Sequence, residues 1–373
     1  MKRSLKRPLG EVAEFINGRA FKPSDWSATG LPIIRIQNLT DAEASANLYD
    51  GNIDERNLVR NGDLLVSWSA TLDVFEWDRG NAVLNQHIFL VRPDYSIIRK
   101  RFLFYALKAV MDQLRGQTHG ATMKHITKGL FSNTEILVPS LEEQEQIENS
   151  VESADTLRTL RARADARTAA LVPALFEEMF GDVVGMKTKW KWLPFRDLVT
   201  IEAKLVDPRE EKYQELPHIG ADRIESKTGN ILPAKTAQED GLISSKFLFD
   251  ERDVLYSKIR PNLRKAGLPE REGLCSADVY PLRPGPMFVR EFLWTYLLTD
   301  HFTNRALEYS ARANMPKLNR EQLESITAPV PPIDLQRKFA SRVASIRAMQ
   351  SAQAASRGRV EGLFQAMVAE VFG

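Results

Sequence analysis

Six residues, Ser257-Lys-Ile-Arg-Pro-Asn262, carry the side chains with the clearest chemical use in this sequence. They follow an expected strand, and the proline constrains a turn that presents Lys258, Arg260 and Asn262, with Arg264 and Lys265 beside them. Arginine and asparagine can make paired hydrogen bonds to guanine and adenine edges, whereas lysine and serine serve phosphates. The turn therefore predicts contact with DNA, and a solvated basic surface is the alternative interpretation.

A turn without bases, Ser67-Trp-Ser-Ala-Thr71, occupies the corresponding place earlier in the chain. It offers the aromatic ring of Trp68 and the hydroxyl groups of Ser67, Ser69 and Thr71 in place of positive charge. If both turns face DNA, the two parts of the chain read different base sequences. The alternative for Trp68 is a place in the hydrophobic core.

Two further stretches, residues 114–130 and 311–320, contain bases and no acid. Patches of this kind neutralise phosphates even in a nearly balanced chain, and the net charge here is only +2. The alternative is again a solvated loop surface. Adding polar residues of other turns, the DNA-binding candidates are Arg35, Gln37, Asn38, Ser67, Trp68, Ser69, Thr71, His87, Arg115, His119, Thr122, Lys124, His125, Arg223, Ser257, Lys258, Arg260, Asn262, Arg264, Lys265, Arg312, Asn314, Lys317 and Arg320.

Motifs of the common enzyme classes are missing from the sequence. There is no glycine-rich nucleotide loop, no nucleophile elbow, no His-Glu-x-x-His or Cys-x-x-Cys pattern, and no Asn-Pro-Pro-Tyr step of an amino-methyltransferase. The five histidines are scattered, and we interpret them as surface or loop residues. Glu202-Ala-Lys204 resembles the end of a nuclease motif, but no Pro-Asp pair precedes it at a suitable distance. We therefore expect no catalytic and no metal-binding residue.

The bulk properties predict a soluble cytoplasmic protein of two or three domains. The 373 residues exceed one ordinary domain, and 43% hydrophobic with 27% charged residues is typical of globular chains. No apolar run approaches the ~20 residues of a membrane span, and no signal-peptide core follows the basic N-terminus. One cysteine, Cys275, excludes an internal disulfide and fits a reducing compartment.

An internal repeat sets the architecture that must position these residues. Val138-Pro139 and Gln144 match Val330-Pro331 and Gln336 at an offset of 192, and Phe-Gly at 180–181 matches Phe-Gly at 372–373. Upstream, residues 62–67 resemble 252–257 at an offset of 190. Preserved order with drifting offsets indicates two copies of one fold. We expect a first module at 1–140, a helix at 141–181, a second module at 182–332 and a helix at 333–373.

The two segments that follow the modules have the apolar spacing of helices. Each would be roughly 60 Å long at 1.5 Å per residue, so one apolar stripe needs a partner, and the other copy is the nearest. Duplicated halves predict an antiparallel pair, although charge does not settle the direction. Pro173 should kink or end the first helix. The expected pairing residues are Ile147, Val151, Leu160, Leu171, Leu175, Phe339, Val343, Ile346, Leu363 and Met367.

The sequence thus predicts an α+β protein, with two mixed α/β DNA-recognition domains in a tandem pseudo-repeat joined by two long antiparallel coiled-coil helices. In this arrangement the chain resembles the specificity subunit of type I restriction–modification systems over essentially its full length. The resemblance rests on the duplicated segments 139–144 and 331–336 and on residues 62–67, 253–262 and 180–182.

This resemblance implies that each module reads one half of a split, asymmetric DNA site, while the paired helices hold the halves apart. It implies as partners double-stranded DNA, two methyltransferase (modification) subunits and the restriction subunits, and no membrane. S-adenosylmethionine, ATP and magnesium are implied on those partners, with no cofactor on this chain. The first turn departs from the second, and Pro173 has no counterpart at Gln365.

Two other functions compete with DNA recognition. A paired-helix adaptor would bind proteins through its modules, and a self-sufficient nuclease would use unfamiliar catalytic residues. Salt-independent association with protein alone would favour the adaptor, and metal-dependent cleavage by the isolated chain would favour the nuclease.

Overall fold

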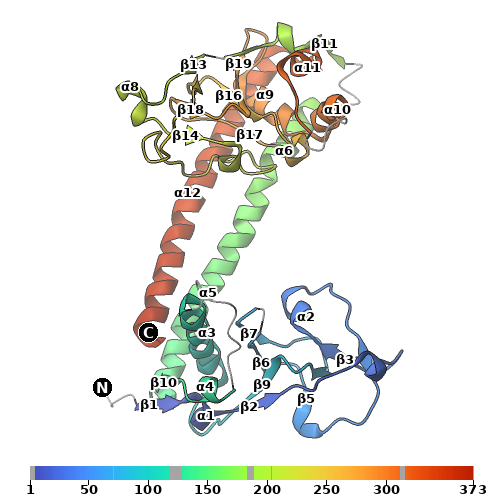
Figure 1. Cartoon of the computed structure of the whole chain (residues 1–373), viewed down its shortest axis with the longest axis vertical. Coiled ribbons are helices and arrows are strands. Elements are labelled where there is room, and N and C mark those ends of the chain that lie inside the picture. Colours follow the sequence, from blue (N-terminus) through green and yellow to red (C-terminus); the bar gives the residue numbers. More distant parts are fainter. Residues whose placement is uncertain are drawn as a thin grey trace. The chain divides into compact units, whose positions relative to one another are not determined.

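The computed structural model describes residues 5–69, 71–117, 128–182, 189–202, 204–310 and 316–372. The chain forms two compact units (Figure 1). The first unit comprises Met1–Leu160 and Arg357–Gly373, and the second comprises Arg161–Ser356. Each unit therefore contains one module together with parts of both long helices.

The first module is built from two four-stranded sheets and a two-stranded ribbon. Its antiparallel sheet has the strand order β2-β9-β6-β7, the second sheet has the order β4-β3-β8-β5, and β1 pairs with β10. The main core lies between the antiparallel sheet and helix α3, where Phe89, Phe102 and Phe131 are fully buried. The strands are β1 Leu5–Pro8, β2 Ala13–Asn17, β3 Leu31–Ile34, β4 Leu48–Tyr49, β5 Leu58–Val59, β6 Leu64–Ser67, β7 Asp73–Glu76, β8 Ala82–Leu84, β9 Ile88–Pro93 and β10 Glu135–Val138, and the helices are α1 Leu9–Val12, α2 Ile36–Thr40, α3 Lys100–Gln117 and α4 Lys128–Ser132.

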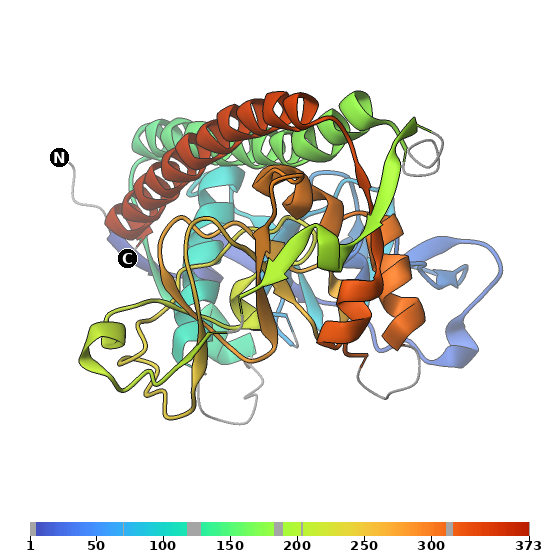
Figure 2. The same cartoon turned by 90° about the horizontal axis from the view of Figure 1, so that it is seen from above.

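The second module repeats this plan. Its sheets have the orders β12-β19-β16-β17 and β13-β15-β18-β14, and β11 runs antiparallel beside β20 (Figure 2). Phe292, Tyr296 and Phe302 fill the equivalent core. The strands are β11 Lys191–Pro194, β12 Val199–Ile201, β13 Leu205–Val206, β14 His218–Ile219, β15 Lys246–Phe249, β16 Val254–Ser257, β17 Ala266–Gly267, β18 Gly273–Cys275, β19 Val279–Pro284 and β20 Thr327–Val330, and the helices are α8 Glu211–Gln214, α9 Arg290–Leu297, α10 Asp300–Ser310 and α11 Arg320–Ser325.

The second sheets of the two modules share three strands and differ in the fourth. β3 runs parallel to β8, as β14 does to β18. β5 is the antiparallel neighbour of β8, and β15 is that of β18. The fourth strand is β4 beside β3 in the first module but β13 beside β15 in the second. The expected α+β fold with two tandem modules is therefore confirmed, with one edge of each sheet built differently.

The long helices are α5 (Leu141–Ala169), α6 (Leu171–Phe180) and α12 (Ile333–Phe372). The first copy is broken at Ala170, three residues before Pro173, whereas α12 is continuous over 40 residues. Because proline lacks an N–H and its ring clashes with the carbonyl four residues earlier, it is tolerated in the first turn of α6 but not inside a helix. The expected interruption at Pro173 is confirmed.

Contacts within each unit show that the helices run antiparallel. In the second unit Thr168 donates to Gln353 at 2.8 Å, and Glu178 lies 3.9 Å from Arg342, so one number rises as the other falls. In the first unit Arg158 forms an ion pair with Glu361. The residues that make these contacts between the helices are polar. They join the helices by hydrogen bonds and ion pairs more than by apolar packing.

The expected apolar stripe is buried or half-buried near the modules and partly exposed between them. Leu160, Leu171 and Leu363 are exposed by 54%, 40% and 55%, so these three are not buried pairing residues. The prediction rested on the spacing of apolar residues. In the structure Arg158, Thr168 and Gln353 hold the positions that face the partner helix. The other pairing candidates are buried or half-buried, namely Ile147, Val151, Leu175, Phe339, Val343, Ile346 and Met367.

Two glutamines fasten the modules to the starts of the helices in the same way. Gln144 is fully buried, accepts from the backbone N–H of Arg99, and donates to the carbonyls of Ile97 and Pro139, all within 2.9 Å. Gln336 is also fully buried, accepts from the backbone N–H of Val289, and donates to the carbonyls of Met287 and Pro331. The match at offset 192 is thus a match in hydrogen bonding.

Candidate nucleic-acid interface

The turns after β6 and β16 begin with equivalent hydrogen bonds. Ser67 donates its hydroxyl to the carbonyl of Ser69 at 3.1 Å, and Ser257 donates to that of Ile259 at 3.2 Å. Both serines are buried. Their expected contact with DNA is therefore corrected, because each hydroxyl is occupied in shaping its own turn.

In the first module this turn carries an aromatic cluster. The ring of Trp68 stacks on Phe89 with 5.9 Å between centroids and meets the edge of His87 at 5.3 Å. Trp68 is half-buried against the main core, so the core interpretation holds for this residue. Nδ1 of His87 is buried and has no hydrogen-bond partner among the residues that the structure describes, while Thr71 is exposed and Ser69 half-buried.

In the second module the equivalent positions are charged. Lys258 takes the place of Trp68. Its backbone N–H donates to the carbonyl of Asp278, as the backbone N–H of Trp68 donates to the carbonyl of His87. Its ammonium lies 4.8 Å from the ring centre of Tyr280. Burial, and then the charge of Lys317, lower the pKa of Lys258, and Lys317 itself lies 3.6 Å from Asp278.

The basic turn continues as a short 3₁₀ helix, Pro261–Leu263, flanked by Arg260 and Arg264. Among the described residues, the side chains of Arg260 and Asn262 are exposed and make no hydrogen bond or ion pair. Arg264 forms an ion pair with Asp300. Lys265 is half-buried and donates its ammonium to the carbonyl of Ala221 at 2.7 Å, and its contact with DNA stays a prediction.

The candidates at the start of α2 divide in the same manner. Asn38 is buried, accepts from the N–H of Arg35 at 3.0 Å and donates to the carbonyls of Ala44 and Ser45. This amide closes its own loop, which corrects the expected contact with adenine. Arg35 lies 5.1 Å over the ring of Trp26, and Gln37 is exposed.

The remaining described bases have local partners. Arg223 donates to the carbonyl of Pro233 at 3.2 Å, Arg320 pairs with Glu324, and Arg115 pairs with Asp112. Local pairs of exposed groups are weak and do not preclude exchange for a phosphate. Six candidates lie outside the described residues: His119, Thr122, Lys124, His125, Arg312 and Asn314.

Sequence reasoning missed Lys227. It is exposed, its φ is 69°, and its N–H donates to the carbonyl of Arg264 at 3.0 Å, which joins it to the basic turn. The Thr-Gly-Asn that follows at 228–230 is a turn signal that would have placed this lysine at a loop tip.

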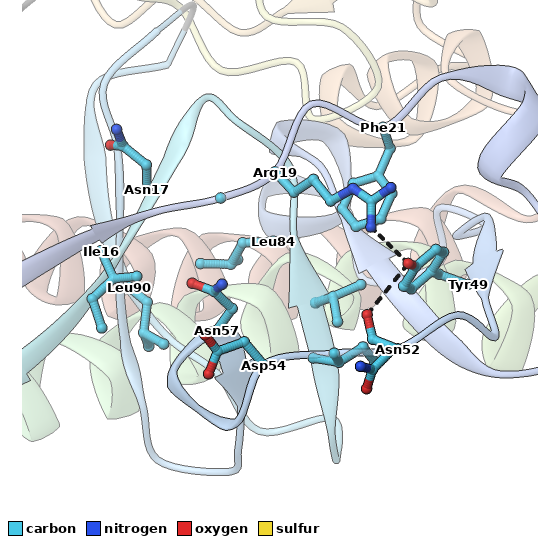
Figure 3. Close-up of a pocket in the computed structure, with 13 residues that line it drawn as sticks. Ile16, Asn17, Arg19, Phe21, Tyr49, Asn52, Asp54, Asn57, Leu84 and Leu90 are labelled. Atoms are coloured by element: carbon cyan, nitrogen blue, oxygen red, sulfur yellow. Dashed lines mark hydrogen bonds between the residues drawn. The ribbon is translucent and has the colours of Figure 1, made fainter.

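A cavity of about 210 Å³ lies in the first module between β2, β4 and β8 (Figure 3). Arg19 donates to the hydroxyl of Tyr49 at 2.6 Å and covers the rings of Phe21 and Tyr49, while Asn52 accepts from that hydroxyl through its backbone. Arg19 and Tyr49 are therefore hydrogen-bonded within the wall, and the residues that line this cavity include no nucleophile with an adjacent base.

Other chemistry finds no support in the described ranges. No three His, Cys, Asp or Glu side chains come together there as ligands of a metal ion. Cys275 is buried, and burial raises the pKa of its thiol. Among those same residues no helix has both the length and the apolar character needed to cross a membrane.

Known proteins agree with this arrangement. A sequence profile of the type I restriction modification DNA specificity domain matches residues 1–163 and 187–352. The specificity subunit of the type I restriction enzyme EcoDI of Escherichia coli is 28% identical over 328 residues, covering 77% of this chain and 72% of that protein. The EcoBI specificity subunit of the same species is 24% identical over 414 residues, covering 99% and 85%.

Solved structures share the fold. The S subunit of a type I restriction–modification system from M. genitalium aligns with a TM-score of 0.63 at 14% identity, covering 100% of this chain and 96% of that one. A structure concerned with complex assembly and conformational transition of the type I R-M system aligns at 0.59 and 19% identity, covering 100% and 98%. The chain therefore belongs to the family of type I restriction–modification specificity subunits, which recognise DNA sequence and leave catalysis to other subunits.

Proposed function

We propose that this chain recognises a split and asymmetric DNA sequence, with each module reading one half. One observation carries the proposal: the turns after β6 and β16 begin with the same two hydrogen bonds but carry different side chains. Trp68 and His87 in the first module stand where Lys258 and Asp278 stand in the second. A shared scaffold with unlike polar groups is what two different half-sites require.

We further propose that two modification subunits dock on the long helices. Leu157 and Leu363 are exposed by 52% and 55% in the first unit, and Met349 and Leu171 by 40% each in the second. Leu157 and Met349 are 192 residues apart, as are Leu171 and Leu363. Because the same two exposed positions recur in both units, two copies of one partner fit them better than two different partners.

The chemistry would then belong to the partners. S-adenosylmethionine is expected on the modification subunits, and ATP with magnesium on the restriction subunits. Family membership supports this assignment, since specificity subunits supply recognition and not reaction.

The direct test is protection of DNA by the chain together with its modification subunits. The complex should protect two short sequences separated by a fixed spacer, and binding should fall steeply with salt. Methylome sequencing of a host that expresses this locus should show the same split site. Salt-independent binding to protein alone would support an adaptor, and metal-dependent cleavage by the isolated chain would show a nuclease.

The helices offer a second test of the same proposal. Matched insertions of one helical turn after Ala164 in α5 and after Ser356 in α12 should change the spacer and leave both half-sites unchanged. A changed half-site would show that the modules do not read DNA independently.

A further inference from the structure

Three residues other than glycine have a positive φ in the described part of the chain, and all three are basic. They are Lys227, Arg260 and Arg264, with φ of 69°, 49° and 51°. Left-handed backbone is unfavourable for any residue with a Cβ, and glycine or asparagine is the usual occupant. Three cations in the places that suit glycine indicate that their side chains are needed, because backbone geometry alone would favour another residue.

The three residues belong to one cluster in the second module. Arg260 and Arg264 flank the 3₁₀ helix Pro261–Leu263, and the N–H of Lys227 donates to the carbonyl of Arg264. Close packing fixes the loop of Lys227, since a Cβ on Gly229 would lie 2.3 Å from the carbonyl oxygen of Ala266. The backbone positions of these residues are therefore set before any ligand arrives.

The charges of this cluster are only partly neutralised. Arg264 forms an ion pair with Asp300, but Lys227 and Arg260 are exposed and have no side-chain partner among the described residues. The corresponding turn of the first module, Ser67–Thr71, contains no base at all. The two modules thus differ in fixed positive charge at equivalent places.

We propose that Lys227 and Arg260 are phosphate anchors for the DNA backbone of the second half-site. This inference rests on the proposed function and adds a division of labour to it. The turn of the second module supplies most of the salt-dependent affinity of the pair of turns, and the turn of the first module contacts its half-site with uncharged groups. The anchors act on any sequence, because phosphates carry no base information.

The test uses the chain with its modification subunits and two duplexes, one selected by that complex from a random pool and one scrambled. Lys227→Ala and Arg260→Ala should each lower affinity several-fold for both duplexes, and each should reduce the slope of log affinity against log salt by roughly one. Lys235→Ala, an exposed lysine of the same module, is the matched control and should change neither. Unchanged slopes with relaxed preference at the second half-site would overturn phosphate anchoring in favour of base reading.

Glycine variants separate function from fold. Lys227→Gly and Arg260→Gly relieve the left-handed strain, so the melting temperature should rise by roughly 2–4 °C while DNA binding weakens as in the alanine variants. Arg260→Lys should retain most of the affinity, because a phosphate accepts either cation. Glycine variants that bind like the parent would refute the proposal. A parent complex that selects no duplex would instead refute the proposed function.

Discussion

The two modules use the same scaffold at the turns after β6 and β16 and place opposite chemistry on it. In the first module Trp68, His87 and Phe89 form an aromatic cluster that extends the hydrophobic core. In the second, Lys258 and Asp278 replace Trp68 and His87: the ammonium of Lys258 lies over the ring of Tyr280, and Asp278 pairs with Lys317. The difference shows that the turn backbone, held by a buried serine in both copies, is independent of the side chains that it presents. Specificity can therefore change there at little cost to the fold.

The joints between modules and helices show the opposite of the turns, because the two copies agree there. Gln144 and Gln336 make the same three backbone hydrogen bonds. The copies differ again at the far helix ends, where Phe180 is 2% exposed and Phe372 only half-buried. Agreement at the joints and divergence at the turns can be tested by matched substitutions.

The largest expected effect is at the end of α6. Phe180→Ala removes a buried ring that contacts Phe176, Phe292 and Phe339, and it should lower the free energy of unfolding by about 3–5 kcal/mol. Phe372→Ala removes a half-buried ring with its centroid 5.1 Å from that of Phe102, and it should cost about 1–2 kcal/mol. Urea denaturation of both variants measures the difference. Equal losses would show that the two helix ends pack equally well.

Next in size are the two glutamines. Gln144→Ala and Gln336→Ala each leave buried backbone groups without a partner, so each should lower the free energy of unfolding by roughly 3 kcal/mol. Gln146→Ala, at an exposed position of α5, is the control and should change it by less than about 0.5 kcal/mol. A loss at only one of the two glutamines would break the equivalence of the joints.

The smallest expected effect is a pH dependence confined to the second module. Hydrogen bonds from Arg252, and then the charges of Arg283 and Arg252, lower the pKa of Asp250 to about 2 against the opposing effect of burial. A depressed carboxyl pKa contributes stability above the unfolded value near 4, and that stability is lost as the pH falls from about 4 to 2. The first module has Arg60 at this place.

Asp250→Asn should therefore reduce the stability of the second module by about 1 kcal/mol at neutral pH and flatten its decline between pH 4 and 2. Hydrogen exchange at backbone amides of β16 and of β6 reports the two modules separately. An equal flattening in β6 would place the titrating group outside the second module.

The sequence was sufficient for the repeat, and therefore for the architecture. Gln144 and Gln336 matched because their hydrogen bonds require that residue type, and Pro173 interrupted its helix because proline does so in any context. The helix seam was less predictable. Leu160 and Leu363 follow the apolar spacing but are exposed, since the partner helix is met by Arg158 and Gln353.

The candidate site was predicted by residue type and corrected by hydrogen bonding. Asn38 and Lys265 have the side chains that DNA contacts need, but each is bound to backbone carbonyls within its own module. Composition cannot reveal such partners, because they come from chain segments brought together only by folding. Lys227 was missed because its left-handed backbone is a property of the loop in which it lies and not of the lysine itself.

The division into units has a consequence for synthesis on the ribosome. The first module emerges first, yet its core includes Val371 and Phe372, and its helix pairs through Glu361 near the end of the chain. Between the two parts of the first unit lie residues 161–356, which take roughly 10–40 s to translate at 5–20 residues per second. The second module meets no such delay, because the residues of α6 that it packs against precede it. The half of the protein that is made first is therefore finished last, and during that interval its hydrophobic surface must be kept from other chains.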